Sequence, residues 1–235
     1  MSSCKKSDNP VVDPPAKIYL ISIYSNSATN QIITYKYDDK NRVINITNTT
    51  PSASSEDKLY YTENDLIARV DTYYPGMQTI TSVFTYIPDS VKIDYLPAGS
   101  TIPGYSTFTL NGEGKPIKSV QGTGPAYTTF AYDANGNKSA LGFYTNGGTL
   151  QGSRTYTYNN TKSPVLNIKG NFSVYLVNPD LVNNYITAVI IAGNNAPIIT
   201  TYTYNYNADG YPVSRTSTTT GSTAITTETF TYVIK

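Results

Sequence analysis

A short aromatic motif recurs along the chain and constrains the fold more than any other feature. An aromatic residue, a small or polar residue, and a second aromatic residue or leucine precede a turn. The second positions of the first six copies are residues 37, 61, 86, 110, 132 and 158, so the steps are 24, 25, 24, 22 and 26 residues. A fixed period of this size is typical of repeat architectures. The next copies, at 206 and 232, follow steps of 48 and 26, and the double step predicts a worn copy near Tyr185.

Each copy predicts one β-hairpin. An aspartate or asparagine commonly follows the motif, as at Asp38, Asp133 and Asn207, with a glycine or asparagine three residues later. Asx side chains bond their own backbone in turns, and glycine or asparagine accepts the positive φ that such turns require. Apolar and charged residues then alternate over 91–95, which is the pattern of a second strand. A unit of about 24 residues therefore provides two strands and two turns.

The repeats predict a single all-β domain over residues 17–235. A lone hairpin is not stable in water, so the units must pair side by side. We expect an antiparallel meander of about nine hairpin repeats, curled into a half-barrel, a barrel or an open β-solenoid. Because side chains alternate across a strand, both rings of a motif share one face, and we expect them to form the core.

The motif resembles the tyrosine–aspartate (YD) repeats of Rhs and teneurin shells. It is also similar to short lipoproteins of the Bacteroidetes type that carry degenerate copies and are domains of unknown function. The resemblance covers residues 31–235, and the aspartate is replaced at Thr62, Ile87, Asn111, Asn159 and Asn207. Large YD shells enclose a protein cargo, which takes dozens of hairpins. About nine hairpins imply a small curled sheet or barrel instead.

The only cysteine, Cys4, follows two serines and precedes a polar stretch. This start resembles the cleavage end of a bacterial lipoprotein signal, in which the cysteine carries the acyl chains. The resemblance implies a lipid anchor on Cys4 and a trimmed chain. Residues 1–16 are then the lipidated N-terminus and a flexible tether, since 5–16 are rich in proline and charge. We therefore expect an outer-membrane lipoprotein of a Gram-negative envelope, facing either the periplasm or the cell surface.

Composition narrows the function. The chain has 17 Lys plus Arg against 16 Asp plus Glu, so it has no strong field to attract nucleic acid. It has no histidine, the commonest general base and metal ligand near neutral pH. We therefore expect no enzyme activity, no cofactor and no metal. The turn Asp133–Asn137 has side-chain oxygens spaced as in a calcium-binding loop. A plain hairpin turn explains these residues better, because the turns of other repeats use the same residue types.

Tyrosine is the distinctive residue, with 23 copies. Its ring can stack on a sugar and its hydroxyl can hydrogen-bond, so the composition suggests glycan binding. The motif rings are better explained as the core of the sheet. The candidates for ligand binding are therefore the tyrosines outside the motif that fall near turns. These are Tyr73, Tyr74, Tyr105 and Tyr144.

The sequence favours a non-catalytic envelope lipoprotein that binds a glycan or another envelope protein. The rival is a structural spacer of the envelope without a ligand. A polysaccharide-acting enzyme is a distant third, and its acids would come from Asp38, Asp39, Glu63, Asp65, Asp71 and Asp94. A binder should expose an aromatic patch or a cleft, whereas a spacer should bury its tyrosines. An enzyme needs two carboxyl groups about 5–10 Å apart in a cleft.

Overall fold

The computed structural model describes residues 17–26, 30–97, 104–122, 126–168 and 182–235. Within these ranges the chain forms sixteen strands. In chain order they are β1 (Ile18–Ser25), β2 (Gln31–Tyr37), β3 (Val43–Thr49), β4 (Ser54–Tyr61), β5 (Ile67–Tyr73), β6 (Ile80–Ile87), β7 (Ser90–Pro97), β8 (Gly104–Leu110), β9 (Pro116–Gln121), β10 (Tyr127–Tyr132), β11 (Lys138–Tyr144), β12 (Leu150–Lys162), β13 (Asn183–Ala192), β14 (Ile198–Tyr206), β15 (Pro212–Thr219) and β16 (Ile225–Ile234). No helix in the described ranges is long and apolar enough to cross a bilayer.

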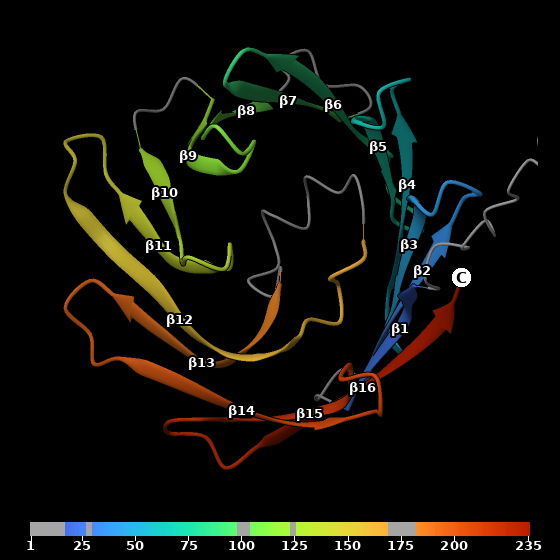
Figure 1. Cartoon of the computed structure of the whole chain (residues 1–235). Helices are drawn as coiled ribbons and strands as arrows, with labels where there is room; N and C mark the ends of the chain where they lie inside the picture. Colours follow the sequence, from blue (N-terminus) through green and yellow to red (C-terminus); the bar gives the residue numbers. More distant parts are fainter. Residues whose placement is uncertain (1–16, 27–29, 98–103, 123–125, 169–181) are drawn as a thin grey trace, which may run out of the picture.

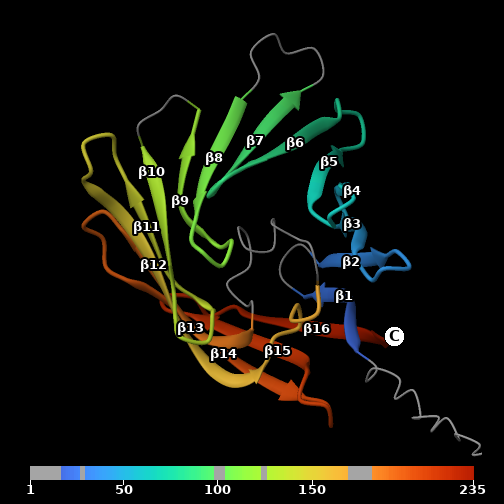
Figure 2. The same cartoon turned by 45° about the horizontal axis from the view of Figure 1, so that its top comes forward.

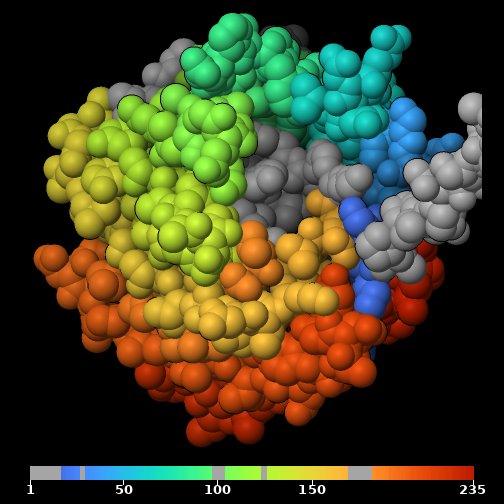
Figure 3. Space-filling model, in the orientation of Figure 1, coloured from blue at the N-terminus to red at the C-terminus, as the bar shows by residue number. Residues whose placement is uncertain are grey.

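The strands form an antiparallel meander that closes into a barrel (Figure 1). Every strand pairs with its neighbours in sequence, and β1 pairs with both β2 and β16. Beyond the last paired residues, Lys17 and Lys235 exchange backbone hydrogen bonds of 2.8 and 2.9 Å. Figure 3 shows the first strands (blue) in contact with the last (red). The all-β meander is confirmed, and of the three shapes expected from the sequence the chain adopts the closed barrel.

The described wall contains eight hairpin units, so the predicted count of about nine is not confirmed. The eight motifs lie on the even-numbered strands β2 to β16, and each of the first seven is followed by a return strand. The eighth motif, Phe230–Tyr232 on β16, has no return strand after it in sequence. Its partner is β1, from the other end of the chain. The barrel therefore closes by completing a repeat, which satisfies the backbone groups that an open sheet would leave at its edges.

The worn copy expected near Tyr185 is also a wrong interpretation. Tyr185 lies on β13, which pairs with β12 on one side and β14 on the other. The step of 48 residues is therefore one ordinary hairpin whose connection has been lengthened to residues 163–182. Figures 1 and 2 show the chain after β12 turning to the inside of the ring. There, Val165 packs against Leu20 and Phe230.

The turns that follow the motif strands share one geometry. In four of them an Asx side chain accepts backbone N–H bonds from the residues two and four positions later, as Asp133 does from Asn135 and Asn137 at 2.9 Å. The residue three positions later has positive φ, for example 86° at Gly136. The same bonds are made by Asp38, Asn111 and Asn207. The predicted Asx turns are thus confirmed, and Asp133–Asn137 makes one of them.

The inner face of the barrel carries the core. Val165 and Ile168, inside the ring, pack in clusters with residues such as Leu20, Phe230 and Val43. A third cluster holds Val91, Ile93 and Phe108. Strand alternation places the motif rings on this same face. Tyr35, Tyr37, Phe84, Phe108, Phe130 and Tyr232 all belong to these clusters, in line with the predicted core role of the motif.

A tyrosine hydroxyl links most hairpins to the preceding unit. Tyr61 donates to the carbonyl of Val43 at 2.5 Å, and Tyr158 donates to that of Lys138 at 2.5 Å. The acceptor is a buried residue near the tight-turn end of the preceding return strand. We call these bonds the latches, and the other pairs are Tyr37–Leu20, Tyr86–Ile67, Tyr132–Pro116, Tyr204–Tyr185 and Tyr232–Pro212. The remaining unit, the fourth in sequence, has Leu110 at the motif position and so lacks the hydroxyl.

Candidate functional site

The meander separates its turns into two ends. The Asx turns that follow the motif strands lie at one end, which we call the tight-turn end. The connections that lead into the motif strands lie at the opposite end, which we call the open rim. Each of the four candidate tyrosines lies at the open rim. Tyr73 ends β5 and Tyr74 follows it, Tyr105 lies at the start of β8, and Tyr144 ends β11. The fold therefore gathers at one rim side chains that the sequence scatters over some 70 residues.

Tyr73 and Tyr74 border a hollow of about 480 Å³ at this rim. Tyr74 is 40% exposed and Tyr73 is 36% exposed. The opposite side of the hollow is polar, with the carboxylate of Glu56 and a row of hydroxyls. The hydroxyl-bearing residues are Thr47, Thr49, Ser54 and Ser55. The hollow thus combines exposed rings with several hydrogen-bonding groups.

The rings at the rim differ in how much of their faces is free. The Lys58 ammonium lies 4.8 Å from the centroid of the Tyr73 ring, and that of Lys92 lies 4.9 Å from the Tyr105 ring. Such cation–π contacts each cover one ring face. No ring or cation contact is recorded for Tyr74 among the described residues. Tyr74 therefore offers the most accessible ring of the first hollow.

Tyr144 lies at a second rim hollow of about 500 Å³. Its ring stacks on Tyr127, with centroids 4.8 Å apart and planes 10° apart. It also lies across Gly142, where a Cβ atom would come within 2.7 Å of the Tyr144 ring. The Lys118 ammonium sits 4.3 Å from the Tyr127 centroid. Tyr144 is therefore packed against the wall, and the sequence did not identify its partner Tyr127.

The outer face carries many polar side chains beside exposed apolar ones such as Ile191 and Ile199. Register places Thr157, Thr187 and Thr201 side by side across β12, β13 and β14. On β4, β5 and β7, acids pair with the cation two residues away on the same face, as Asp71 does with Arg69 at 3.2 Å. The corresponding pairs are Glu56–Lys58 and Asp94–Lys92.

The acids considered for catalysis are mostly held by cations. Asp38 and Asp65 both contact Arg42, at 2.6 Å each, beside the tight turns. Bonds from the Arg42 and Lys40 backbone and from the Arg42 side chain lower the pKa of the Asp38 carboxyl, although burial opposes them. Asp71 and Asp94 belong to the outer pairs above. No group of three metal-binding side chains occurs among the described residues.

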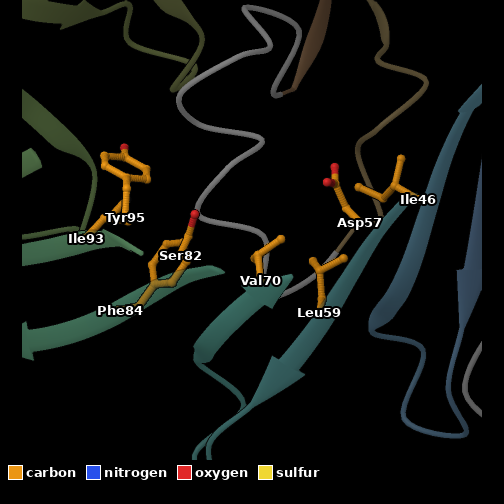
Figure 4. Close-up of a pocket in the computed structure, with 8 residues that line it drawn as sticks. All are labelled: Ile46, Asp57, Leu59, Val70, Ser82, Phe84, Ile93 and Tyr95. Carbon is orange, nitrogen blue, oxygen red and sulfur yellow. The ribbon is translucent and has the colours of Figure 1, made fainter. Parts of the chain in front are cut away.

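One inward-facing acid, Asp57, lines a cavity, and the sequence did not single it out. Asp57 lines an inner cavity of about 160 Å³ that spans β3 to β7 (Figure 4). The other lining residues are mostly apolar: Ile46, Leu59, Val70, Ser82, Phe84, Ile93 and Tyr95. In sequence, Glu56-Asp57-Lys58 looks like a solvated charged run. Strand alternation was the available signal, because Asp57 shares its face with Leu59 and Tyr61 of the motif.

Two solved structures are similar to this chain over most of its length. No protein-family model matches the chain, and no curated protein matches it. Among solved structures, a porin-like protein from Bacteroides uniformis is 13% identical, covers 91% of this chain and 98% of its own, and has a TM-score of 0.45. A porin-like protein from Bacteroides vulgatus is 11% identical, covers 92% and 99%, and has a TM-score of 0.47. At these values the likeness carries no conclusion about ligands or location, and the YD-repeat resemblance stays a prediction.

Cys4 and the tether over residues 1–16 lie outside the described residues.

Proposed function

We propose that this protein is a non-catalytic binding module of the cell envelope that takes glycan chains at the open rim. The observation that carries the proposal is the hollow beside Tyr74, where an exposed ring faces a row of hydroxyls and the Glu56 carboxylate. A sugar offers both an apolar face and a set of hydroxyl groups. An aromatic ring can stack on the former, while serine, threonine and carboxylate oxygens bond the latter.

The rim also has the shape for an extended ligand. The two hollows lie at the same end of the barrel, on the units β3–β5 and β8–β11, with Tyr105 on β8. A chain molecule can contact several such points, and linked weak contacts raise the overall affinity. A single monosaccharide would reach only one hollow. The proposal therefore favours oligosaccharides over monosaccharides.

We further propose that a lipid on Cys4 holds the barrel at an outer membrane while the barrel itself stands in water. A membrane-spanning barrel presents an apolar band to lipid and a polar interior. Here the outer face carries threonines and ion pairs, and the inner face carries the apolar clusters. Metabolic labelling of cells with an alkyne fatty acid should mark the wild-type protein and not Cys4→Ala. Labelling that persists in the variant would contradict the anchor.

The glycan proposal is tested with an oligosaccharide array followed by titration calorimetry of each hit. Tyr74→Ala should weaken a true rim ligand about fivefold or more, because stacking on an aromatic ring contributes on the order of 1–3 kcal/mol. The matched control is Tyr60→Ala. Tyr60 is equally exposed at 40% on the outer face, but lies near the tight-turn end of β4. A blank array, or equal losses in both variants, would contradict glycan binding at the rim.

The alternative is a structural spacer, which is favoured by a different observation. Seven motif tyrosines donate their hydroxyls to latch hydrogen bonds between units, so most of the repeated rings stabilise the barrel wall. A blank array would leave this alternative as the better account. A polysaccharide-acting enzyme remains a third possibility, and the lack of enzyme activity stays a prediction. Incubation of array hits with the protein, followed by mass analysis for shortened chains, checks it.

A further inference from the structure

The inner cavity beside Asp57 combines apolar walls with one carboxylate and two hydroxyl groups. Its floor is formed by apolar side chains, among them Leu59, Val70 and Phe84, and Figure 4 shows Asp57 at one side of them. The cavity spans β3 to β7 and so lies on the inner face, away from the rim hollows. Its volume of about 160 Å³ is the scale that holds one small ring, since an apolar cavity of about 150 Å³ binds benzene.

Asp57 is the unusual member of this cavity. Its one recorded hydrogen bond among the described residues is from the Thr72 hydroxyl, at 2.6 Å. No cation of the described chain lies within ion-pair distance of it. The inner face carries a second acid, Glu228, and that acid is paired with Arg215 at 2.5 Å. The acids on the outer face of the same strands, Glu56 and Asp71, also have cations.

A carboxylate without a cation is costly at the edge of an apolar cavity. Burial raises the pKa of Asp57, because the ionised form loses hydration that the cavity walls do not replace. A ligand with a positive charge would restore that lost interaction. Ser82 and Tyr95, whose hydroxyls also line the cavity, can accept further bonds from an ammonium group.

We propose that this cavity is a binding site for a small protonated amine with a single-ring or short hydrocarbon body. The ammonium group pairs with Asp57, and the hydrocarbon lies against Leu59, Val70 and Phe84. The site is independent of the proposed glycan function, because none of its lining residues borders either rim hollow.

Three probes of one shape test the proposal by calorimetry or ligand-observed NMR. Benzylamine is cationic at pH 7, benzyl alcohol is neutral and benzoate is anionic. We expect saturable binding of benzylamine, binding of benzyl alcohol at least tenfold weaker, and no binding of benzoate. Asp57→Asn should lower the affinity for benzylamine to that for benzyl alcohol. Glu56→Gln, one residue away on the outer face, should leave all three affinities unchanged.

A second variant separates the cavity from the charge. Val70→Phe should fill the space and abolish binding of benzylamine and benzyl alcohol alike, and it also serves if Asp57→Asn does not fold. Benzylamine binding that survives Asp57→Asn, equal affinity for amine and alcohol, or no binding of any probe would each overturn the proposal. Glycan titration of Asp57→Asn and Val70→Phe should be unchanged, because neither residue borders a rim hollow, so failure of one site is distinguishable from failure of the other.

Discussion

The two ends of the barrel are built on opposite plans. At the tight-turn end, Asx residues and a position of positive φ recur from turn to turn, and buried residues accept the latch hydroxyls. At the open rim, the connections vary in length and composition, and exposed tyrosines border two hollows. The same sixteen strands join both ends. The comparison suggests that one end maintains the repeat, whereas the other is free to vary and to bind.

The largest expected effect concerns Lys138, directly after a tight turn. Its side chain is 1% exposed, and burial lowers its pKa to about 8. Between pH 8 and the ordinary lysine value of 10.5, the unfolded chain keeps the proton and the folded chain releases it. The free energy of unfolding should therefore rise by about 2–3 kcal/mol from pH 8 to pH 10. Denaturant titrations at several pH values measure this rise.

Two lysine variants control for this rise, and buried tyrosines set its upper limit in pH. Lys138→Met should remove the slope, and Lys36→Met, at an exposed position, should keep it. Above pH 10 the sign reverses, because burial raises the pKa of Tyr35, Tyr61 and Tyr86 to about 12. Their phenols ionise first in the unfolded chain, so stability should then fall. A flat profile between pH 8 and 10 would show that the tight-turn end does not hold Lys138 in a dry environment.

The latches should give the next largest effect. Tyr158→Phe keeps the ring but leaves the carbonyl of buried Lys138 without its 2.5 Å bond. The expected loss in free energy of unfolding is about 1–3 kcal/mol, because an unsatisfied buried group loses its hydration without compensation. Tyr73→Phe, at the open rim, is the matched control and should change stability by less than about 0.5 kcal/mol. Equal losses would break the contrast between the two ends.

A smaller effect should come from the turn backbone. In the turn after β8, Gly114 has φ of 75° and Gly112 does not have positive φ, and an added Cβ meets no atom within 4 Å at either position. Gly114→Ala should therefore lower the free energy of unfolding by about 1–2 kcal/mol through backbone strain alone. Gly112→Ala should be near neutral. Chemical denaturation of both variants measures the difference, and similar values would argue against a conformational requirement at the tight turns.

The smallest effect on stability is expected where binding is proposed. Tyr74→Ala removes an exposed ring with no recorded ring or cation contact among the described residues, so stability should change by less than about 0.5 kcal/mol. Thermal unfolding of this variant, done beside the glycan titration, checks that any lost affinity is not lost folding. A large drop in midpoint temperature would show that the rim is structural after all.

The success of the sequence-based predictions follows the same division. The hairpin period, the Asx turns and the core role of the motif rings could be predicted, because each depends on residues close together in the chain. The number of hairpin units could not be predicted from the sequence. The lengthened connection over 163–182 looks like a lost repeat, and the unit completed by β1 and β16 joins the two ends of the chain. In the sequence, Asp57 differs from its charged neighbours Glu56 and Lys58 only in its place in the strand alternation, which points its side chain to the inner face.

By itself, the sequence determined the local units: alternation of ring and polar residue, turn chemistry and period are all set within about two dozen residues. Only the tertiary structure decided that the sheet closes, that seven buried residues accept hydroxyls from tyrosines of adjacent units, and that Tyr73, Tyr74, Tyr105 and Tyr144 share one rim. The physical reason is that a hairpin pairs with whichever strand edge it meets. Closure depends on the summed twist and stagger of sixteen strands, a property of the whole sheet that no single repeat contains.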